Sequence, residues 1–233
     1  MPSSAQLQTM HPLFAANMHL VGKSAKDCPP LSSDLSNLEA WILERGCHPR
    51  PPTNGLYSNL SAKGKPTADS RGSMGFRFLL GNLKDWDEKV SVSMRTGLSH
   101  HVGTCEIVLP RKNHPEFKQV PLMQQLLELV VAHWPVYFAI VAERGWSPAV
   151  NWIDKHPEGL ERLLIGWLTY VEDASIVEAL PAGLKHEPLG PGLMFQLCDH
   201  FPSYENPDDV ALGLRVRQAL QAAGRLRVRK LTR

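Results

Sequence analysis

The sequence predicts an α+β fold in which a mostly antiparallel central sheet is flanked by helices. Three short segments, 76–80, 90–95 and 104–109, are rich in β-prone residues, and the second alternates Val and Met with Ser and Arg. The connections between them are short and carry turn-forming residues, which favours antiparallel pairing in a meander. Helical periodicity occurs in separate segments, and this segregation of strands and helices is typical of the α+β class.

Helices are predicted in four segments. Residues 33–46 show apolar residues at helical spacing, with a serine as N-cap and a glycine as the stop. Pro121 opens a second helix, which ends near Trp134 because the following proline removes a hydrogen-bond donor. A short helix with its own tryptophan is expected at 146–156. The last helix covers 207–223, where acidic residues precede arginines as the helix dipole favours.

Four more strands are predicted in the C-terminal half. Residues 136–142 are nearly all apolar and β-prone, which predicts a central strand buried on both faces. Residues 163–171 are predicted to form another buried strand. The last two are expected at 184–187 and 192–197, on either side of a turn rich in proline and glycine.

We expect a single folded domain. The length of 233 residues allows one large domain or two small ones. Residues 1–30 are predicted to form an N-terminal arm, and residues 31–223 a single α+β domain. Residues 47–75 are rich in Gly, Pro, Ser and Asn and are predicted to be a long loop within that domain. Residues 224–233 form a basic C-terminal tail, which is predicted to be solvated and disordered.

Composition and patterning indicate a cytoplasmic protein. Hydrophobic residues make up 43% of the chain and charged residues 21%, so a sizeable core can form. The longest apolar stretch, residues 126–142, is interrupted by Glu, His and Pro, which excludes a membrane-spanning helix. The start of the chain lacks the pattern of a signal peptide. Four cysteines without a CxxC pair are expected to be reduced, as in a cytosol.

The net charge of +2 hides an uneven distribution. Residues 210–233 hold seven Lys and Arg and no acid, which leaves a charge of −5 on residues 1–209. The chain is therefore a mildly acidic body with a basic tail. Guanidinium groups bind phosphates, but the tail lacks interleaved aromatic residues, so nucleic-acid binding is not favoured.

The strongest pattern for an enzyme is Glu116-Phe117-Lys118, with Glu106 ten residues earlier. Restriction-type nucleases combine acidic metal ligands with an E-x-K pair on a strand. Here Glu116 follows a proline and is predicted to lie in a loop. The alternative function is therefore a metal-dependent nuclease or hydrolase that uses Glu106, Glu116 and Lys118 or the histidines His100, His101 and His114, and it is not the favoured one.

Two histidine-containing clusters are candidates for metal binding: His100, His101 and His114, and the run Cys198-Asp199-His200. Neither has a recognisable zinc spacing. Adjacent histidines point to opposite faces of an extended segment, so they cannot both bind one ion without a turn. Signatures of dinucleotide and nucleoside-triphosphate binding are absent. We therefore assign no catalytic, metal-binding or cofactor-binding residue and expect no small-molecule substrate.

Acidic residues gather in predicted connections between strands and helices. Such connections usually carry binding residues on a rigid scaffold. One group surrounds a tryptophan, and an aromatic ring among carboxylates suits a basic partner. The candidate binding residues are Asp85, Trp86, Asp87, Glu88, Glu172, Asp173, Glu205, Asp208 and Asp209.

Six segments follow one another within residues 76–220: VSVSMRTG, EIVLP, AHWPVYFAIVA, GWLTYV, PLGPGLMFQL and NPDDVALGLRVRQAL. In this order they resemble the immunity protein 52 family of bacterial polymorphic-toxin systems. The resemblance implies an antitoxin that binds and neutralises a cognate toxin, for which the partner is expected to be a restriction-endonuclease-fold DNase of type VI secretion. An acidic body suits a basic nuclease, since complementary charge steers association.

Overall fold

The computed structural model describes residues 18–20, 28–30, 76–82, 90–96, 104–110, 114–134, 136–151 and 160–230. Contacts between residues divide the chain into two compact units, one within residues 3–114 and the other within residues 115–232. The strands of both units are antiparallel and helices accompany them, so the predicted α+β class is confirmed. The single domain expected at 31–223 stays a prediction.

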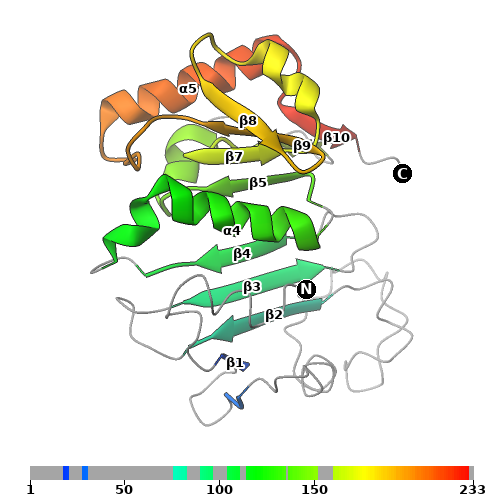
Figure 1. The fold of residues 1–233 in the computed structure, drawn as a ribbon, viewed down its shortest axis with the longest axis vertical. Helices are drawn as coiled ribbons and strands as arrows, with labels where there is room; N and C mark the ends of the chain where they lie inside the picture. The colour runs from blue at the N-terminus through cyan, green and yellow to red at the C-terminus, as the bar shows by residue number, and fades with distance from the viewer. Residues whose placement is uncertain are drawn as a thin grey trace, which may run out of the picture. The chain divides into compact units, whose positions relative to one another are not determined.

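The first unit contains a four-stranded sheet in the order β1-β2-β3-β4 (Figure 1). The predicted meander is confirmed, because β3 pairs antiparallel with both β2 and β4. Asn82 closes the β2–β3 connection: its N–H donates to Val90 O at 3.1 Å, and its Oδ1 accepts from Val90 N at 3.2 Å. The strands are β1 (His19–Leu20), β2 (Phe76–Gly81), β3 (Ser91–Thr96) and β4 (Thr104–Val108).

Two pieces of the N-terminal arm belong to this sheet. β1 pairs antiparallel with β2, and His19 also forms a bridge with Pro30. The His19 ring reinforces the bridge, because its Nδ1 lies 3.0 Å from Cys28 O. The predicted helix at 33–46 and the predicted loop at 47–75 lie outside the described residues.

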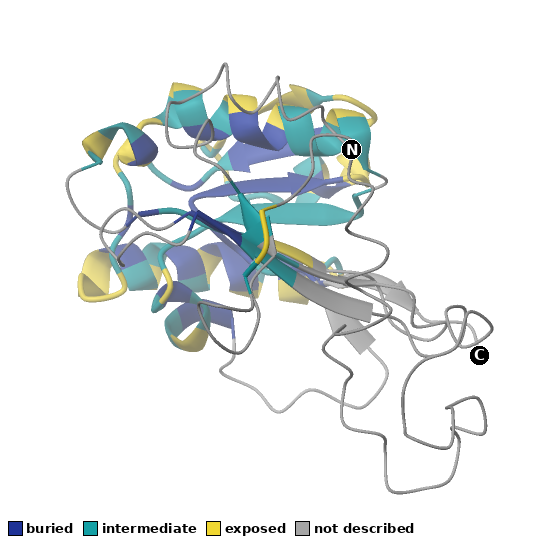
Figure 2. Ribbon diagram, turned by 90° about the horizontal axis from the view of Figure 1, so that it is seen from below, coloured by how far each residue is buried: buried dark blue, intermediate teal, exposed yellow. Residues whose placement is uncertain are grey.

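The second unit places a four-stranded antiparallel sheet, in the order β5-β7-β9-β8, between helices on both of its faces (Figure 2). Two further strands, β6 and β10, pair with each other. The strands are β5 (Phe138–Val141), β6 (Leu160–Arg162), β7 (Leu168–Val171), β8 (Lys185–Leu189), β9 (Gly192–Gln196) and β10 (Arg227–Lys230). The helical elements are η4 (Pro115–Lys118), α4 (Val120–His133), η5 (Ser147–Asn151), η6 (Ala174–Ala179) and α5 (Pro207–Ala222).

Every residue of β7 is buried, because both faces of the strand are covered. Val171 and its cross-strand partner Leu193 belong to a core that includes Val216 and Leu220 of α5. Tyr170 projects to the opposite face and is fully buried on the side where α4 contacts the strand. The sheet therefore has two apolar layers, one on each side.

The strand predicted at 136–142 is present, but its predicted central position is wrong. β5 is the outermost strand of the described sheet, and its four residues are only half-buried. An apolar run shows that helices cover both faces of a strand, but it does not show whether one edge or two edges are paired. Register and strand order are decided by partners far away in the sequence.

The strand predicted at 163–171 begins later than expected, at Leu168. Residues 163–166 are buried or half-buried but irregular, because the side chain of Asn151 takes the place of a neighbouring strand. Asn151 Nδ2 donates to Ile165 O at 3.0 Å, and Ile165 N donates to Asn151 Oδ1 at 2.8 Å. Asn151 ends η5, a π-helical turn that is the described part of the helix predicted at 146–156.

The β8–β9 hairpin and the last helix agree with the sequence. β8 runs further than predicted, so the turn shrinks to Gly190 and Pro191, with Gly190 at a φ of 54° that favours glycine. Pro188 is tolerated because β8 is an edge strand of the described sheet. α5 begins at Pro207, where the Asn206 side chain accepts a hydrogen bond from Asp208 N at 3.1 Å.

The predicted disorder of the basic tail is wrong as far as Lys230. β10 pairs antiparallel with β6, and Leu226 just before it is buried. Leu163 N donates to Leu226 O at 2.8 Å, which ties the start of the tail to the core. Charge density alone gave no sign of this pairing, because the partner strand lies more than sixty residues earlier in the chain.

We predict that Asn151→Ala destabilises the protein by about 2 kcal/mol, because the N–H of Ile165 would lose its buried partner, whereas the C=O of Ile165 keeps a hydrogen bond from Trp146 Nε1 at 2.8 Å. Urea unfolding followed by circular dichroism measures the change. Ser147→Ala is the control, since among the described residues the Ser147 hydroxyl accepts one long hydrogen bond, from the Asn151 amide at 3.4 Å, whose loss should cost less than about 1 kcal/mol. Equal, small effects of both substitutions would contradict the role assigned to Asn151.

Candidate functional site

Two of the acidic residues singled out from the sequence follow the buried strand β7. Glu172 and Asp173 are both exposed. Asp173 caps η6, with its Oδ1 accepting from Ser175 N at 3.1 Å and from Ser175 Oγ at 2.6 Å. Its Oδ2 lies 3.3 Å from Arg225 Nη1. The Ser175 hydrogen bonds, together with the Arg225 charge, hold the pKa of Asp173 below its usual value.

A small hollow of about 140 Å³ lies beside these two acids. Its wall combines apolar side chains with Glu172, Asp173 and Arg225, which add charges of both signs. The volume suits one inserted side chain rather than a cofactor, since ligand pockets usually hold about 300 Å³ or more. The apolar part of the wall is Tyr137, Leu163, Val171 and Ile176.

The second described acidic group lies in the connection between β9 and α5, residues 197–206, and in the first turn of α5. Glu205 and Asp208 are exposed, but Asp209 is only 5% exposed. Asp209 Oδ2 accepts from Ser203 N at 2.9 Å. Burial alone would raise the pKa of Asp209, but the hydrogen bonds from Ser203 and His200 outweigh it and lower the pKa. Asp209 therefore anchors the connection, while its acidic neighbours face solvent.

Tyr204 is the exposed aromatic residue of this connection, and the sequence reasoning did not single it out. It is 41% exposed, the one large hydrophobic residue of that kind among the residues described. Glu143 holds the backbone beneath it, accepting from Tyr204 N and from Ser203 Oγ, each at 3.2 Å. The Tyr204 hydroxyl donates to Glu205 Oε1 at 3.2 Å. In the sequence, the one signal for an exposed Tyr204 is its position next to Glu205, a candidate binding residue.

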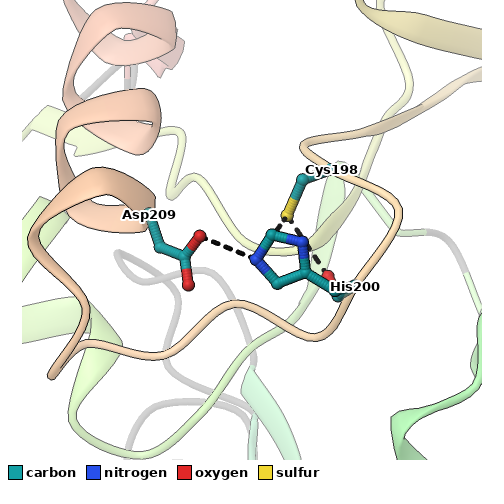
Figure 3. Close-up of side chains that lie close together, drawn as sticks. All are labelled: Cys198, His200 and Asp209. Atoms are coloured by element: carbon teal, nitrogen blue, oxygen red, sulfur yellow. Dashed lines mark hydrogen bonds and ion pairs between the residues drawn. The ribbon is translucent and has the colours of Figure 1, made fainter.

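Three reactive side chains meet at the same place (Figure 3). Cys198 and His200 come from the β9–α5 connection, and Asp209 comes from the first turn of α5. His200 Nε2 lies 2.7 Å from Asp209 Oδ1 and 4.0 Å from Cys198 Sγ. The Cys198 thiol is also 3.2 Å from the backbone oxygen of His200.

This arrangement does not have the geometry of a catalytic triad. In a triad the nucleophile and the carboxylate bind opposite nitrogens of the imidazole ring. Here Asp209 occupies Nε2, which is also the nitrogen that faces Cys198. Burial, and after it the charge of Asp209, raises the pKa of the Cys198 thiol to about 11, so the thiolate needed for attack is scarce at neutral pH.

Comparison with known families decides which class of protein this is. The family model for immunity protein 52 matches residues 53–229, well over half of the chain. The chain belongs to the immunity protein 52 family. The match to immunity protein 52 extends beyond the resemblance seen in residues 76–220, because it includes part of the predicted loop at 47–75 and most of the basic tail. A search of the curated proteins finds no match to the chain.

The E-x-K pattern does not have nuclease geometry in this immunity protein 52 member. Glu116 and Lys118 lie in η4, a 3₁₀ turn, where residues two apart point in different directions. On the strand that a nuclease requires, they would share a face. Glu106 is an exposed residue of β4 in the other unit.

Several sequence candidates stay untested by this geometry. Asp85, Trp86, Asp87 and Glu88 lie outside the described residues, as do His100 and His101. His114 is described, half-buried, just before η4. No helix among the described residues is long and apolar enough to cross a bilayer.

We predict that the purified protein cleaves no DNA in the presence of Mg²⁺ or Mn²⁺. Agarose gels of supercoiled plasmid after long incubation should match the buffer control, because the E-x-K residues do not share a face. Wild type and Glu116→Ala should give identical gels. Metal-dependent cleavage that disappears in Glu116→Ala would contradict this prediction and restore the nuclease alternative.

Proposed function

We propose that this chain is an antitoxin, which protects the cell that makes it by binding one cognate secreted toxin. Inhibition is stoichiometric and takes place in the cytoplasm, without catalysis or a small-molecule substrate. The match to immunity protein 52 over residues 53–229 carries this proposal. The geometry around Cys198 and the 3₁₀ turn at Glu116 support it, since neither has the arrangement that catalysis needs.

The proposed toxin is a nuclease with a basic surface, of the restriction-endonuclease-fold DNase class delivered by type VI secretion. Enzymes that bind DNA present positive charge to the phosphates. Residues 1–209 of the antitoxin carry −5, and opposite charges accelerate encounter between the two proteins. The basic residues of β10 lie in a strand that pairs with β6.

The proposed docking surface consists of Tyr204 and Glu205 in the β9–α5 connection and Asp208 in the first turn of α5. An exposed aromatic ring beside carboxylates provides an apolar anchor and a charge that steers a basic partner. The connection is held in place by Glu143 and Asp209, so little order has to be gained on binding. At the end of β7, by contrast, Asp173 is already paired with Arg225.

We predict a one-to-one complex with a dissociation constant in the nanomolar range or below, burying about 1,200 to 2,000 Å². An antitoxin must outcompete DNA for the toxin inside the cell, and weak binding would leave active toxin. Titration calorimetry with the cognate toxin measures the affinity. Binding weaker than about 1 μM would be incompatible with stoichiometric protection.

We predict that reversing the charge of the docking surface slows association. The double variant Glu205→Lys, Asp208→Lys should lower the association rate about tenfold at low salt and flatten its salt dependence. Tyr204→Ala should act mainly on dissociation, because a buried anchor contributes after encounter. Surface plasmon resonance at several salt concentrations separates the two effects.

Two control variants locate the effect. Glu128→Lys reverses one charge on the exposed face of α4, and Glu172→Lys reverses one at the end of β7, so each makes half the charge change of the double variant. Glu128→Lys should leave the association rate within about twofold of wild type. A larger effect of Glu172→Lys than of the double variant would move the docking surface to the end of β7. Unchanged rates in all variants would reject both acidic surfaces.

A further inference from the structure

Three side chains with metal-binding donor atoms converge where β9 leads into α5. Cys198 Sγ, a ring nitrogen of His200 and a carboxylate oxygen of Asp209 all lie within 4.8 Å of one another. No other group of three such side chains meets this criterion in the described part of the chain. We propose that Cys198, His200 and Asp209 bind a zinc ion. This site does not depend on toxin binding.

The distances between the donor atoms are close to those of a tetrahedral zinc site. Zn–S bonds of about 2.3 Å and Zn–N bonds of about 2.0 Å place sulfur and nitrogen about 3.5 Å apart. The observed separations are 4.0 Å from Cys198 Sγ to His200 Nε2 and 2.7 Å from His200 Nε2 to Asp209 Oδ1. Turning the His200 ring toward Cys198 shortens the first and lengthens the second. The ring has room to turn, because its side chain is 64% exposed.

The set of donor atoms selects zinc over the common hard cations. Magnesium and calcium prefer oxygen ligands in sixfold or higher coordination, and a thiolate and an imidazole suit neither. Zinc accepts sulfur, nitrogen and carboxylate oxygen in one tetrahedral shell. Three protein ligands leave the fourth position to water, which can reach it past the exposed His200 ring.

The carboxylate ligand is already oriented by its own hydrogen bond. Ser203 N donates to Asp209 Oδ2 at 2.9 Å, which leaves Oδ1 directed at the proposed ion. Such outer contacts fix the direction of a ligand and raise affinity. When the sulfur bonds to zinc, the Cys198 thiol releases its proton to solvent.

A zinc ion at this position would join the end of β9 to the first turn of α5. The connection between them then has a fixed point at each end, in addition to the hydrogen bonds to Glu143. Binding to the folded state alone also stabilises the protein, because the three ligands come together only after the sheet and α5 have packed.

The experiment uses the full chain, reduced and stripped of metal with a chelator. Calorimetric titration with ZnCl₂ should show one ion per chain with micromolar or tighter affinity. Titration with CoCl₂ should give the absorption of a tetrahedral site together with a thiolate-to-cobalt charge-transfer band. His200→Ala should weaken zinc binding by about 100-fold or more, and Cys198→Ser should abolish the charge-transfer band.

Matched controls come from an exposed cysteine and an exposed histidine elsewhere in the described chain. Cys105→Ser and His186→Ala should leave stoichiometry and affinity unchanged. Circular dichroism and urea midpoints verify that each variant is folded. The proposal is overturned if wild type takes up no zinc, if His200→Ala binds as tightly as wild type, or if Cys198→Ser keeps the charge-transfer band.

Discussion

The burial of β7 on both faces and along both edges sets the arrangement of the second unit. No water reaches its backbone, so every N–H and C=O near it needs a partner from the protein. Strands β5 and β9 supply these partners along the strand itself. Just before it, the side chain of Asn151 supplies them to Ile165, and just after it Glu172 N donates to Tyr137 O at 3.0 Å. The exposed acids Glu172 and Asp173 follow directly after the buried strand.

The same constraint explains why acids that look alike in sequence have different roles. Asp209 is turned inward, where its carboxylate satisfies Ser203 N and the His200 ring. Asp208, its neighbour, is exposed and faces solvent. Asp173 lies between these cases, since it caps η6 and pairs with Arg225 while remaining exposed. The number of Asp and Glu residues in the sequence therefore overstates the negative charge that is exposed to a binding partner.

The two proposals meet in the β9–α5 connection. One side of it presents Tyr204 and Glu205 to solvent, and the other brings Cys198 and His200 to Asp209. A connection fixed by an ion and by Glu143 would be ordered before a toxin arrives, and prior order lowers the entropic cost of association. The family match and the metal site rest on separate observations, so the failure of one leaves the other intact.

Features that depend on near neighbours are predictable from the sequence. They are the meander of β2, β3 and β4, the capped start of α5, the β8–β9 hairpin, and the order of segments by which immunity protein 52 is recognised. Turn residues, helix caps and the alternation of apolar and polar residues act over a few positions, so they can be recognised in a single sequence. Tertiary packing was needed to establish that β5 is an outer strand of the described sheet, that the basic tail pairs with β6, and that Asp209 joins Cys198 and His200. Each of these depends on partners brought together by packing of the core, and neither spacing nor composition records which distant segments will meet.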